Sequence, residues 1–352
     1  MAAADWLMRE AGAIGGRVGF EAFDVSRLDA RDPYLALEGG VRILGEALYD
    51  APGTPEGGVS GRLGTRTGGI RVVERPPDAA YSPGFVALRQ RPGPAGLVVV
   101  TTGGAPGLAL LDAPAFRAPF GPPTLQVTSF EHARLTAAMA RGAMAKLVVA
   151  TRRTATNARN VVVRVAGRVP GLAPLVVATP RSAWWHATGE RGGGLVCWLE
   201  ALRALAEAPP TREVLFLATS GDELGHLGLS DFLARHRGIV AGATWVQLGA
   251  NIGAAGGTVA LAATTPPLRH LAAAAVARAG HPAVPLGTAL PDSDGTIRAI
   301  QRAGAACVAL GGTNRLFHLP QDRWPHAVDL DRVVRLAAAV AEIVARLGRQ
   351  AT

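Results

Sequence analysis

Cysteine and lysine are both scarce in this sequence. Of the 352 residues only two are cysteines, Cys197 and Cys307, and each lies in an apolar stretch. Two isolated cysteines exclude the framework of a disulfide-rich domain, and their apolar neighbours predict buried thiols in a reducing compartment. Lys146 is the sole lysine, so the 36 basic residues are almost all arginine.

Long apolar runs and basic clusters are missing as well. No stretch reaches the roughly 18 uncharged apolar residues of a spanning helix, and no basic segment precedes an apolar run at the N-terminus as in a secretory signal. The formal charge of +9 comes from dispersed arginines, whose longest cluster is Arg152-Arg153. We therefore expect a cytoplasmic protein that binds neither nucleic acid nor membrane.

The remaining composition is that of a folded protein. Hydrophobic residues make up 49% of the chain and charged residues 18%, which supplies enough apolar material for a sizeable core. The 44 glycines and 25 prolines follow no fixed period, so a collagen-like structure is excluded. A chain of this length predicts two domains or one large one.

Strand and helix patterns alternate from about residue 160 onward. Apolar runs typical of strands occupy 96–102, 123–128, 146–151, 160–167, 174–179, 214–219, 244–249 and 306–312. Helical spacing of apolar residues occupies 129–142, 194–208, 227–236, 265–280 and 329–348. Residues 1–40 resemble a helical opening segment, and we expect 160–167 and 174–179 to pair as a hairpin. The alternation predicts a mostly parallel sheet with helices on both faces.

Ligands on such sheets bind beyond the carboxyl ends of the strands. The segment after Thr179 carries two tryptophans, His186 and Glu190, and its glycine run opens a helix. The segment after Thr219 carries Asp222 and Glu223 side by side. One of these carboxylates could bind a metal while the other acts as a base, and an acidic loop that caps the next helix is an equal alternative.

Two further segments complete this set of strand ends. The segment after Leu248 offers no charged side chain, and the one after Gly312 contains His318. A serine mechanism has little support, because Ser220 and His226 flank the acidic pair without a Gly-x-Ser-x-Gly turn. Ser293 has no better context, and Cys197 falls on the core face of a predicted helix.

In this order the segments resemble the co-catalytic zinc aminopeptidase family, which includes bacterial leucyl aminopeptidases, glutamate carboxypeptidases and, more distantly, glutaminyl cyclases. The stretches that carry the resemblance are VVATPRS, ATGERGGGL, SGDELGHLG, QLGANIG and FHLPQD. It implies a three-layer αβα domain with a mostly parallel central sheet, formed by residues 1–40 and 160–352. Residues 41–159 then form a smaller, β-rich α+β insert that resembles a protease-associated domain.

The resemblance implies a site that has lost the private ligands of one zinc. The family's first ligand His falls on Thr179, and its later ligand Asp falls on Gly249. The Asp beside that first His falls on Arg181, whose permanent positive charge opposes a second metal ion. A two-zinc aminopeptidase is therefore the least favoured interpretation.

The ligands implied for the other zinc are retained. Glu223 and His318 match that zinc's Glu and His, and Asp222 falls on the base position. The bridging Asp falls on Gly189, or on Glu190 if one residue is inserted. A catalytic zinc usually takes three protein ligands, and Glu190 is the best third. The weaker third-ligand candidates are His186, His226 and Asp294.

The leading interpretation is a pseudoenzyme that needs no cofactor and binds a peptide or a small amine or amide. Arg181, Trp184, Trp185 and His186 are the candidate substrate-binding residues. The alternative is a mono-zinc hydrolase or cyclase that acts on an amide or a peptide N-terminus, with Glu190, Glu223 and His318 as ligands and Asp222 as base. A homo-oligomer, or a protein partner that completes the site, is left open.

Overall fold

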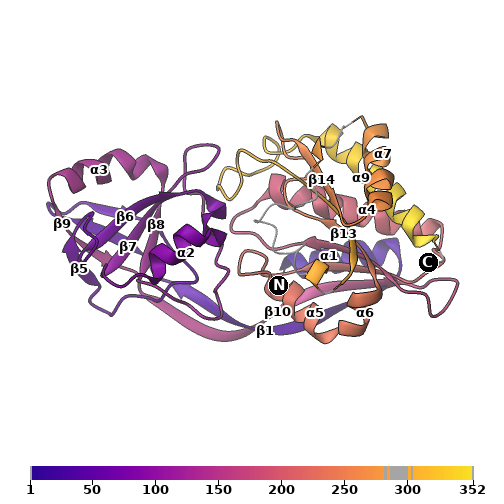
Figure 1. Ribbon diagram of the computed structural model, residues 1–352, viewed down its shortest axis with the longest axis horizontal. Helices are drawn as coiled ribbons and strands as arrows, with labels where there is room; N and C mark the ends of the chain where they lie inside the picture. The colour runs from indigo at the N-terminus through magenta and orange to yellow at the C-terminus, as the bar shows by residue number, and fades with distance from the viewer. Residues whose placement is uncertain (1, 281–283, 286–299, 303, 351–352) are drawn as a thin grey trace.

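The computed structural model describes residues 2–280, 284–285, 300–302 and 304–350. It divides into two lobes, which are joined by a long two-stranded ribbon (Figure 1). Ser293 and Asp294 lie outside the described residues. Within the part described, no helix combines the length and the apolar composition needed to cross a membrane.

The larger lobe is built on an eight-stranded sheet in the order β1-β10-β12-β11-β13-β16-β14-β15. The strands are β1 Arg17–Ala30, β10 Thr151–Val165, β11 Leu175–Pro180, β12 Val214–Thr219, β13 Thr244–Leu248, β14 Val259–Ala263, β15 Val284–Pro285 and β16 Ala306–Gly312. The central strands β12, β11, β13 and β16 are parallel, whereas β1, β10 and β14 join in antiparallel register. Every residue of β11 and β12 is buried, as expected for strands covered on both faces.

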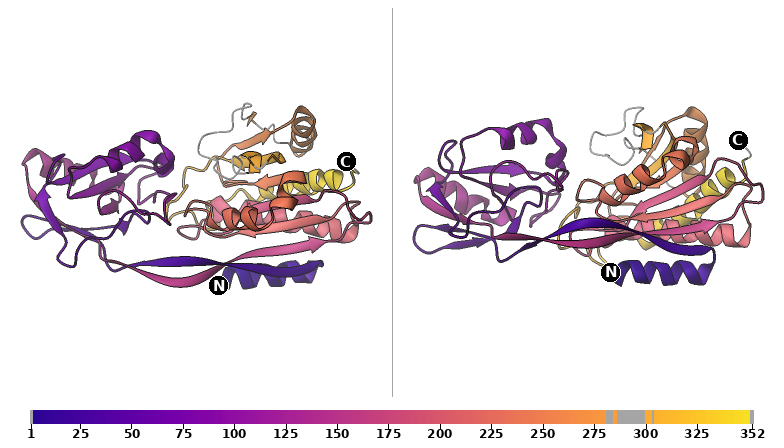
Figure 2. Two further views of the ribbon diagram at one scale, coloured as in Figure 1. Left: turned by 60° about the horizontal axis from the view of Figure 1, so that its bottom comes forward. Right: turned by 90° about the horizontal axis from the view of Figure 1, so that it is seen from below.

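Helices cover both faces of this sheet, which confirms the predicted three-layer architecture (Figure 2). The helices are α1 Ala2–Ile14, α4 Gly193–Glu207, α5 Leu227–Arg235, α6 Arg237–Gly242, α7 Pro266–Arg278 and α9 Leu330–Gly348. Trp198 of α4 and Val340 of α9 share a core with α1, whereas Phe232 of α5 packs with Trp245 on the other face. Cys197 and Cys307 are both free and buried, as predicted.

Two sequence-based expectations for this lobe are wrong. β10 and β11 do not form a hairpin, because β12 lies between them. After β11 the chain passes through α4 and returns as β12, which pairs with β11 in parallel. The other edge of β12 pairs with β10 in antiparallel register, so β10 does not contact β11 as a strand neighbour. Residues 17–30 are not helical either, since they form β1 and pair with β10 along their whole length.

The smaller lobe contains two four-stranded sheets, in the orders β3-β2-β9-β5 and β4-β8-β7-β6. Their strands are β2 Tyr34–Leu37, β3 Arg42–Leu44, β4 Glu46–Ala47, β5 Val59–Arg62, β6 Ile70–Arg75, β7 Gly96–Thr101, β8 Thr124–Val127 and β9 Met144–Val148. The helices α2 Pro83–Gln90 and α3 His132–Ala140 complete it. Leu35, Val98 and Leu147 belong to its own apolar core. The boundaries 1–40, 41–159 and 160–352 stay predictions.

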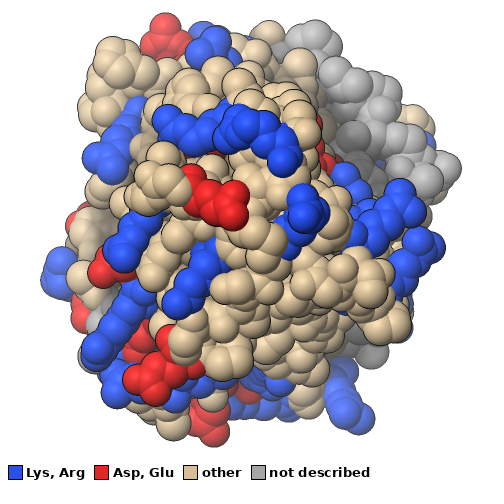
Figure 3. Space-filling model, turned by 90° about the vertical axis from the view of Figure 1, so that its left-hand side faces the viewer, with Lys and Arg blue, Asp and Glu red and all other residues tan. Residues whose placement is uncertain are grey.

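The outer face of the smaller lobe carries basic side chains that are interrupted by acidic groups and by uncharged surface (Figure 3). The dispersion seen in the sequence is thus also present on this face in space. Whether the protein binds nucleic acid is not tested by this observation, and the negative expectation stays a prediction.

Candidate functional site

The ends of the four parallel strands meet at one edge of the large sheet, and the predicted site residues gather there. The residue after β11 donates from its backbone, since Arg181 N lies 2.8 Å from Thr219 O of β12. Beyond β13, Asn251 N donates to Glu190 O at 2.8 Å. Beyond β16, Asp322 O accepts from Thr188 N at 3.1 Å. At this edge Glu190, Asp222, Glu223 and His318 lie in one cluster, since the first three share Arg191 and His318 faces Glu190.

Asp322 orients the turn that precedes α4. Its Oδ1 accepts from Gly189 N at 2.6 Å, and its Oδ2 accepts from Glu190 N at 3.0 Å. A Cβ on Gly189 would lie 2.6 Å from Ala327 O, so this position has no room for a side chain. Residues Thr188–Gly192 form a single π-helical turn, a local insertion that is frequent at functional sites. The side chain that faces the cluster is therefore that of Glu190 and not one at Gly189.

Arg191 lies at the centre of the cluster, a role that the sequence interpretation missed. Its Nη2 is 2.9 Å from Glu190 Oε1, 3.0 Å from Asp222 Oδ2 and 2.7 Å from Glu223 Oε1. Its Nε donates to Ser182 O at 2.7 Å, which fixes the plane of the guanidinium group. Only 7% of the arginine side chain is exposed. One permanent cation thus occupies the space between three carboxylates.

The ionisation of these groups follows from their mutual pairing. Burial alone would lower the pKa of Arg191, but Glu190, Asp222 and Glu223 together raise it above its ordinary value. Burial would likewise raise the pKa of Asp222, but Arg191 and then His226 hold it below its ordinary range. Burial opposes ionisation of Glu190 in the same way, and Arg191 and His318 lower its pKa. Arg191 and both of these carboxylates are therefore charged at neutral pH.

Two side chains hold the acidic pair in place. Ser182 Oγ donates to Glu223 Oε2 at 2.7 Å and accepts from the backbone N–H groups of Gly221 and Asp222. His226 Nδ1 lies 2.8 Å from Asp222 Oδ1, so Asp222 has an imidazole on one side and Arg191 on the other. Asp222 is consequently engaged as an ion-pair partner and is not presented as a free base.

His318 faces two carboxylates at slightly more than hydrogen-bond distance. Its Nδ1 donates to Leu110 O at 2.7 Å, and its Nε2 is 3.6 Å from Glu190 Oε1 and 3.7 Å from Asp112 Oδ1. Burial would lower the pKa of His318, but Glu190 and Asp112 raise it to about 9. Burial raises the pKa of Asp112 to about 7, against the attraction of His318. His318 is therefore cationic at neutral pH.

A loop of the smaller lobe covers this site. Asp112 belongs to it, and Ala113 N donates to Glu223 O at 2.7 Å. Gly225 has φ +80°, and a Cβ there would lie 2.6 Å from Pro114 O, so the two loops are in direct contact. This contribution was not predictable from the sequence, because residues 103–118 are far from the other site residues along the chain.

Unusual backbone conformations concentrate around the cluster. Five non-glycine residues in the described part of the chain have positive φ, and four of them are Ala187 (49°), His226 (56°), Asn251 (69°) and His318 (60°). Left-handed φ values are costly for residues with a Cβ and persist where the surroundings enforce them. The strain marks this edge of the sheet as the specialised part of the molecule.

The predicted substrate-binding residues lie around the cluster without facing it together. Arg181 Nη2 donates to Arg159 O at 2.6 Å, and no ion pair within 4 Å joins Arg181 to a carboxylate among the described residues, although its charge attracts Glu223 at longer range. The Trp184 ring packs edge-on against Tyr49 of the smaller lobe, with ring centroids 4.8 Å apart. Trp185 Nε1 donates to His318 O at 2.9 Å, and His186 is exposed. Their role in binding stays a prediction.

A zinc ion does not fit the residues as they are arranged. Within the described residues, no group of three or more His, Cys, Asp or Glu side chains has the geometry to hold a metal ion. The guanidinium of Arg191 lies between Glu190 and Glu223, where a shared metal would have to bind, and His226 is occupied by Asp222.

Comparisons with known proteins show the fold. No family model matches the sequence, and no curated protein matches it. A zinc aminopeptidase from Bacillus subtilis has a similar structure, with a TM-score of 0.79 and 16% identity over 99% of this chain and 89% of that one. A peptidase M28 precursor from Shewanella amazonensis has a TM-score of 0.78 and 15% identity, over 100% of this chain and 88% of that one. An aminopeptidase from Aneurinibacillus sp. has a TM-score of 0.70 and 17% identity, over 99% of this chain and 88% of that one.

At these identities the similarity establishes architecture alone. The predicted zinc-aminopeptidase-like α/β fold is confirmed, and it extends over nearly the whole chain. Activity and ligands do not follow from it, because one fold can host unrelated functions.

Proposed function

We propose that this chain is a metal-independent, non-peptidase member of the zinc aminopeptidase fold that binds a peptide or small amine through its acidic cluster. The ion pairs of Arg191 with Glu190, Asp222 and Glu223 carry the proposal. A guanidinium supplies charge neutralisation without an open coordination position, so it can neither polarise a carbonyl nor activate water as a metal does.

The charge balance of the cluster supports an amine as the ligand. Three carboxylates, those of Glu190, Asp222 and Glu223, share the Arg191 guanidinium, and a fourth carboxyl group, Asp112, faces His318. Asp112 Oδ1 is buried and has no hydrogen-bond partner among the described residues. The side chains of Asp112 and Asp222 are 15% and 17% exposed, so the acidic surplus reaches the surface. An ammonium group with three donors suits these acceptors.

Metal content tests the first half of the proposal. Purified protein without a histidine tag is dialysed against zinc and then against buffer, and zinc per chain is measured by elemental mass spectrometry. We expect no retained zinc and no hydrolysis of leucine p-nitroanilide. About one tightly held zinc per chain, lost in Glu223→Gln, would overturn the proposal.

Calorimetry tests the second half. Leucinamide is titrated into the protein and compared with 4-methylpentanamide, which has the same body without the amine. We expect binding of leucinamide alone, weakened about tenfold by Asp112→Asn because a charge-assisted contact is lost. Asp78→Asn removes an exposed carboxylate of the smaller lobe and serves as the matched control. Equal binding of both compounds would refute an amine site.

One observation favours the mono-zinc alternative. Glu190 Oε1 and Asp112 Oδ1 converge on His318 Nε2 from 3.6 and 3.7 Å. A hydrolase or cyclase on this basis would use Glu190 and His318 with Asp112 or Glu223, after Arg191 had moved aside. The zinc measurement above separates it from the leading proposal.

A further inference from the structure

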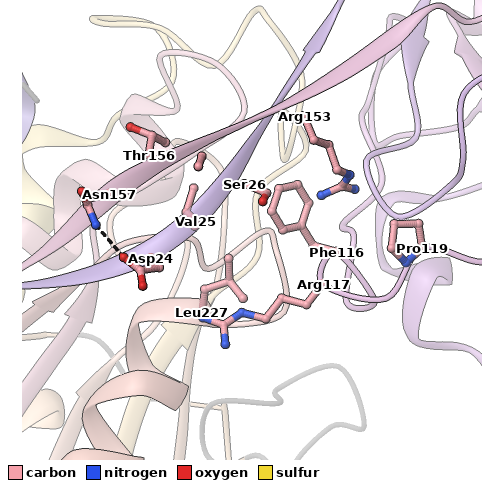
Figure 4. Close-up of a pocket in the computed structure, with 11 residues that line it drawn as sticks. Asp24, Val25, Ser26, Phe116, Arg117, Pro119, Arg153, Thr156, Asn157 and Leu227 are labelled. Carbon is pink, nitrogen blue, oxygen red and sulfur yellow. Dashed lines mark hydrogen bonds between the residues drawn. The ribbon is translucent and has the colours of Figure 1, made fainter.

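A second cavity lies between the two lobes, apart from the acidic cluster. Its volume is about 720 Å³, within the roughly 300–1,000 Å³ of small-molecule sites. The ribbon of β1 and β10 supplies one wall, residues 116–119 of the smaller lobe supply another, and Leu227 at the start of α5 closes it (Figure 4). The cavity thus joins the smaller lobe, the connecting ribbon and the larger lobe.

Two arginines give this cavity a positive character. Arg153 Nη2 donates to Tyr49 O at 2.9 Å, and its guanidinium carbon lies 4.5 Å from the centre of the Phe116 ring. These contacts hold the cation in one orientation before any ligand arrives. Arg117 is exposed and has no hydrogen bond or ion pair with the described residues. A fixed and a free guanidinium on one cavity suit an anion.

The acidic side chain of the cavity lies on the side away from Arg153 (Figure 4). Asp24 Oδ1 accepts from Asn157 Nδ2 at 2.7 Å across the ribbon, and Figure 4 shows this pair at the far side of the cavity from Arg153. The rest of the lining is largely apolar, from Val25, Phe116 and Leu227. The lining is therefore suited to a ligand with an anionic group attached to an apolar body.

We propose that this cavity binds a small carboxylate with an apolar body, whose carboxylate pairs with Arg117 and Arg153 and whose body packs on Phe116 and Leu227. Such a ligand contacts both lobes and the ribbon at once. The cavity shares no lining residue with the amine-binding cluster, and its ligand needs no ammonium group.

Isothermal titration calorimetry with N-acetyl-leucine tests the proposal, with N-acetyl-leucinamide as the uncharged control. We expect one site per chain for the acid and none for the amide. Arg117→Gln and Arg153→Gln should each weaken binding by about tenfold. Arg152→Gln is the matched control, since Arg152 is the neighbour of Arg153 on β10, 73% exposed, and does not line the cavity.

The outcomes are distinct. Arg117 is exposed, so its variant reports on binding even if Arg153→Gln perturbs folding, which a thermal melt reveals. Equal binding of N-acetyl-leucine and N-acetyl-leucinamide would show that the carboxylate does not contribute to binding, and would overturn the proposal. A loss of affinity in Arg152→Gln as large as in Arg153→Gln would mean that general surface charge, and not the cavity, attracts the ligand, and would overturn the proposal. Displacement of N-acetyl-leucine by an equal concentration of inorganic phosphate would mean that the apolar body contributes nothing, and would also overturn the proposal.

Discussion

Replacement of Arg191 by methionine is the sharpest test of the charge arrangement at the centre of the molecule. Methionine has a similar length and no charge, so Arg191→Met leaves three carboxylates together without their shared cation. Glu190 and Glu223 are 1% and 4% exposed, and water cannot replace the lost partner. Removal of one partner from a buried ion pair costs about 3–5 kcal/mol. We expect a loss of this size in the free energy of unfolding at pH 7.5.

The deficit should depend on pH in a defined direction. In the native protein the lowered pKa values of Glu190 and Asp222 contribute stability above their ordinary pKa values, and this is lost as pH falls. In the variant the cation is gone, so burial raises the same pKa values and the carboxylates take up protons more readily. The difference between the two proteins should therefore be largest at pH 7.5 and should shrink by pH 5.

Urea unfolding at pH 7.5 and pH 5, followed by circular dichroism, measures both effects. Arg203→Met is the matched control, because Arg203 lies on α4, the helix that follows the turn of Arg191, is 55% exposed and pairs among the described residues with Glu200 alone, at 3.3 Å. We expect a change of no more than about 0.5 kcal/mol there. Glu190→Gln combined with Arg191→Met should recover part of the loss. A deficit below about 1 kcal/mol, or one that is equal at both pH values, would show that Arg191 is not the neutralising group.

Three further predictions follow from neighbouring contacts. The pKa of His318 is raised from 6.5 to about 9, so its contribution to stability is complete below about pH 6.5 and lost as pH rises through 9. We expect a decline of at most about 3 kcal/mol over that range, absent in His318→Gln, and a flat profile in the native protein would contradict the assignment. Asp322→Ala leaves the N–H groups of Gly189 and Glu190 without an acceptor and should cost about 2–4 kcal/mol in urea unfolding. Gly225→Ala should increase amide hydrogen exchange in residues 110–116, because its Cβ would lie 2.6 Å from Pro114 O, whereas a Gly171→Ala control has a similar φ of +81° and nothing within 4 Å.

The central sheet was predictable because its central strands β11, β12, β13 and β16 are largely buried. A continuous apolar run such as 214–219 can be recognised as a buried strand from its length and its flanking turns alone. β1 escaped recognition for the opposite reason. Of its 14 residues only Phe23 and Leu28 are buried, since much of the strand lies in a ribbon with no helix layer over it. Pairing order was also beyond reach, because spacing alone does not tell which edge of β12 receives β10.

The site was predictable where strand ends determine it. Glu190, Asp222, Glu223 and His318 follow parallel strands, and such ends meet at one edge of a sheet. Arg191 was missed because its orientation depends on the π-helical turn at Thr188–Gly192, which shifts by one residue the side chain that faces inward. A basic residue directly after Glu190 in a glycine-rich turn was the only signal. Asp112 had none, because it comes from the other lobe.

In this geometry Glu223 and His318 each have an electrostatic role that needs no metal ion. Arg191 is buried, and a buried guanidinium needs carboxylates around it to offset its loss of hydration. The ion pair between Arg191 and Glu223 therefore stabilises the charged form of both side chains. His318 is held by Leu110 O and flanked by Glu190 and Asp112, which links the covering loop to the sheet edge by charge. Loss of the Glu223 or the His318 side chain would leave an oppositely charged group in the interior without that partner. Carboxylate and imidazole side chains at such a sheet edge can thus serve electrostatic purposes alone, and their presence in a sequence is not by itself evidence for a metal.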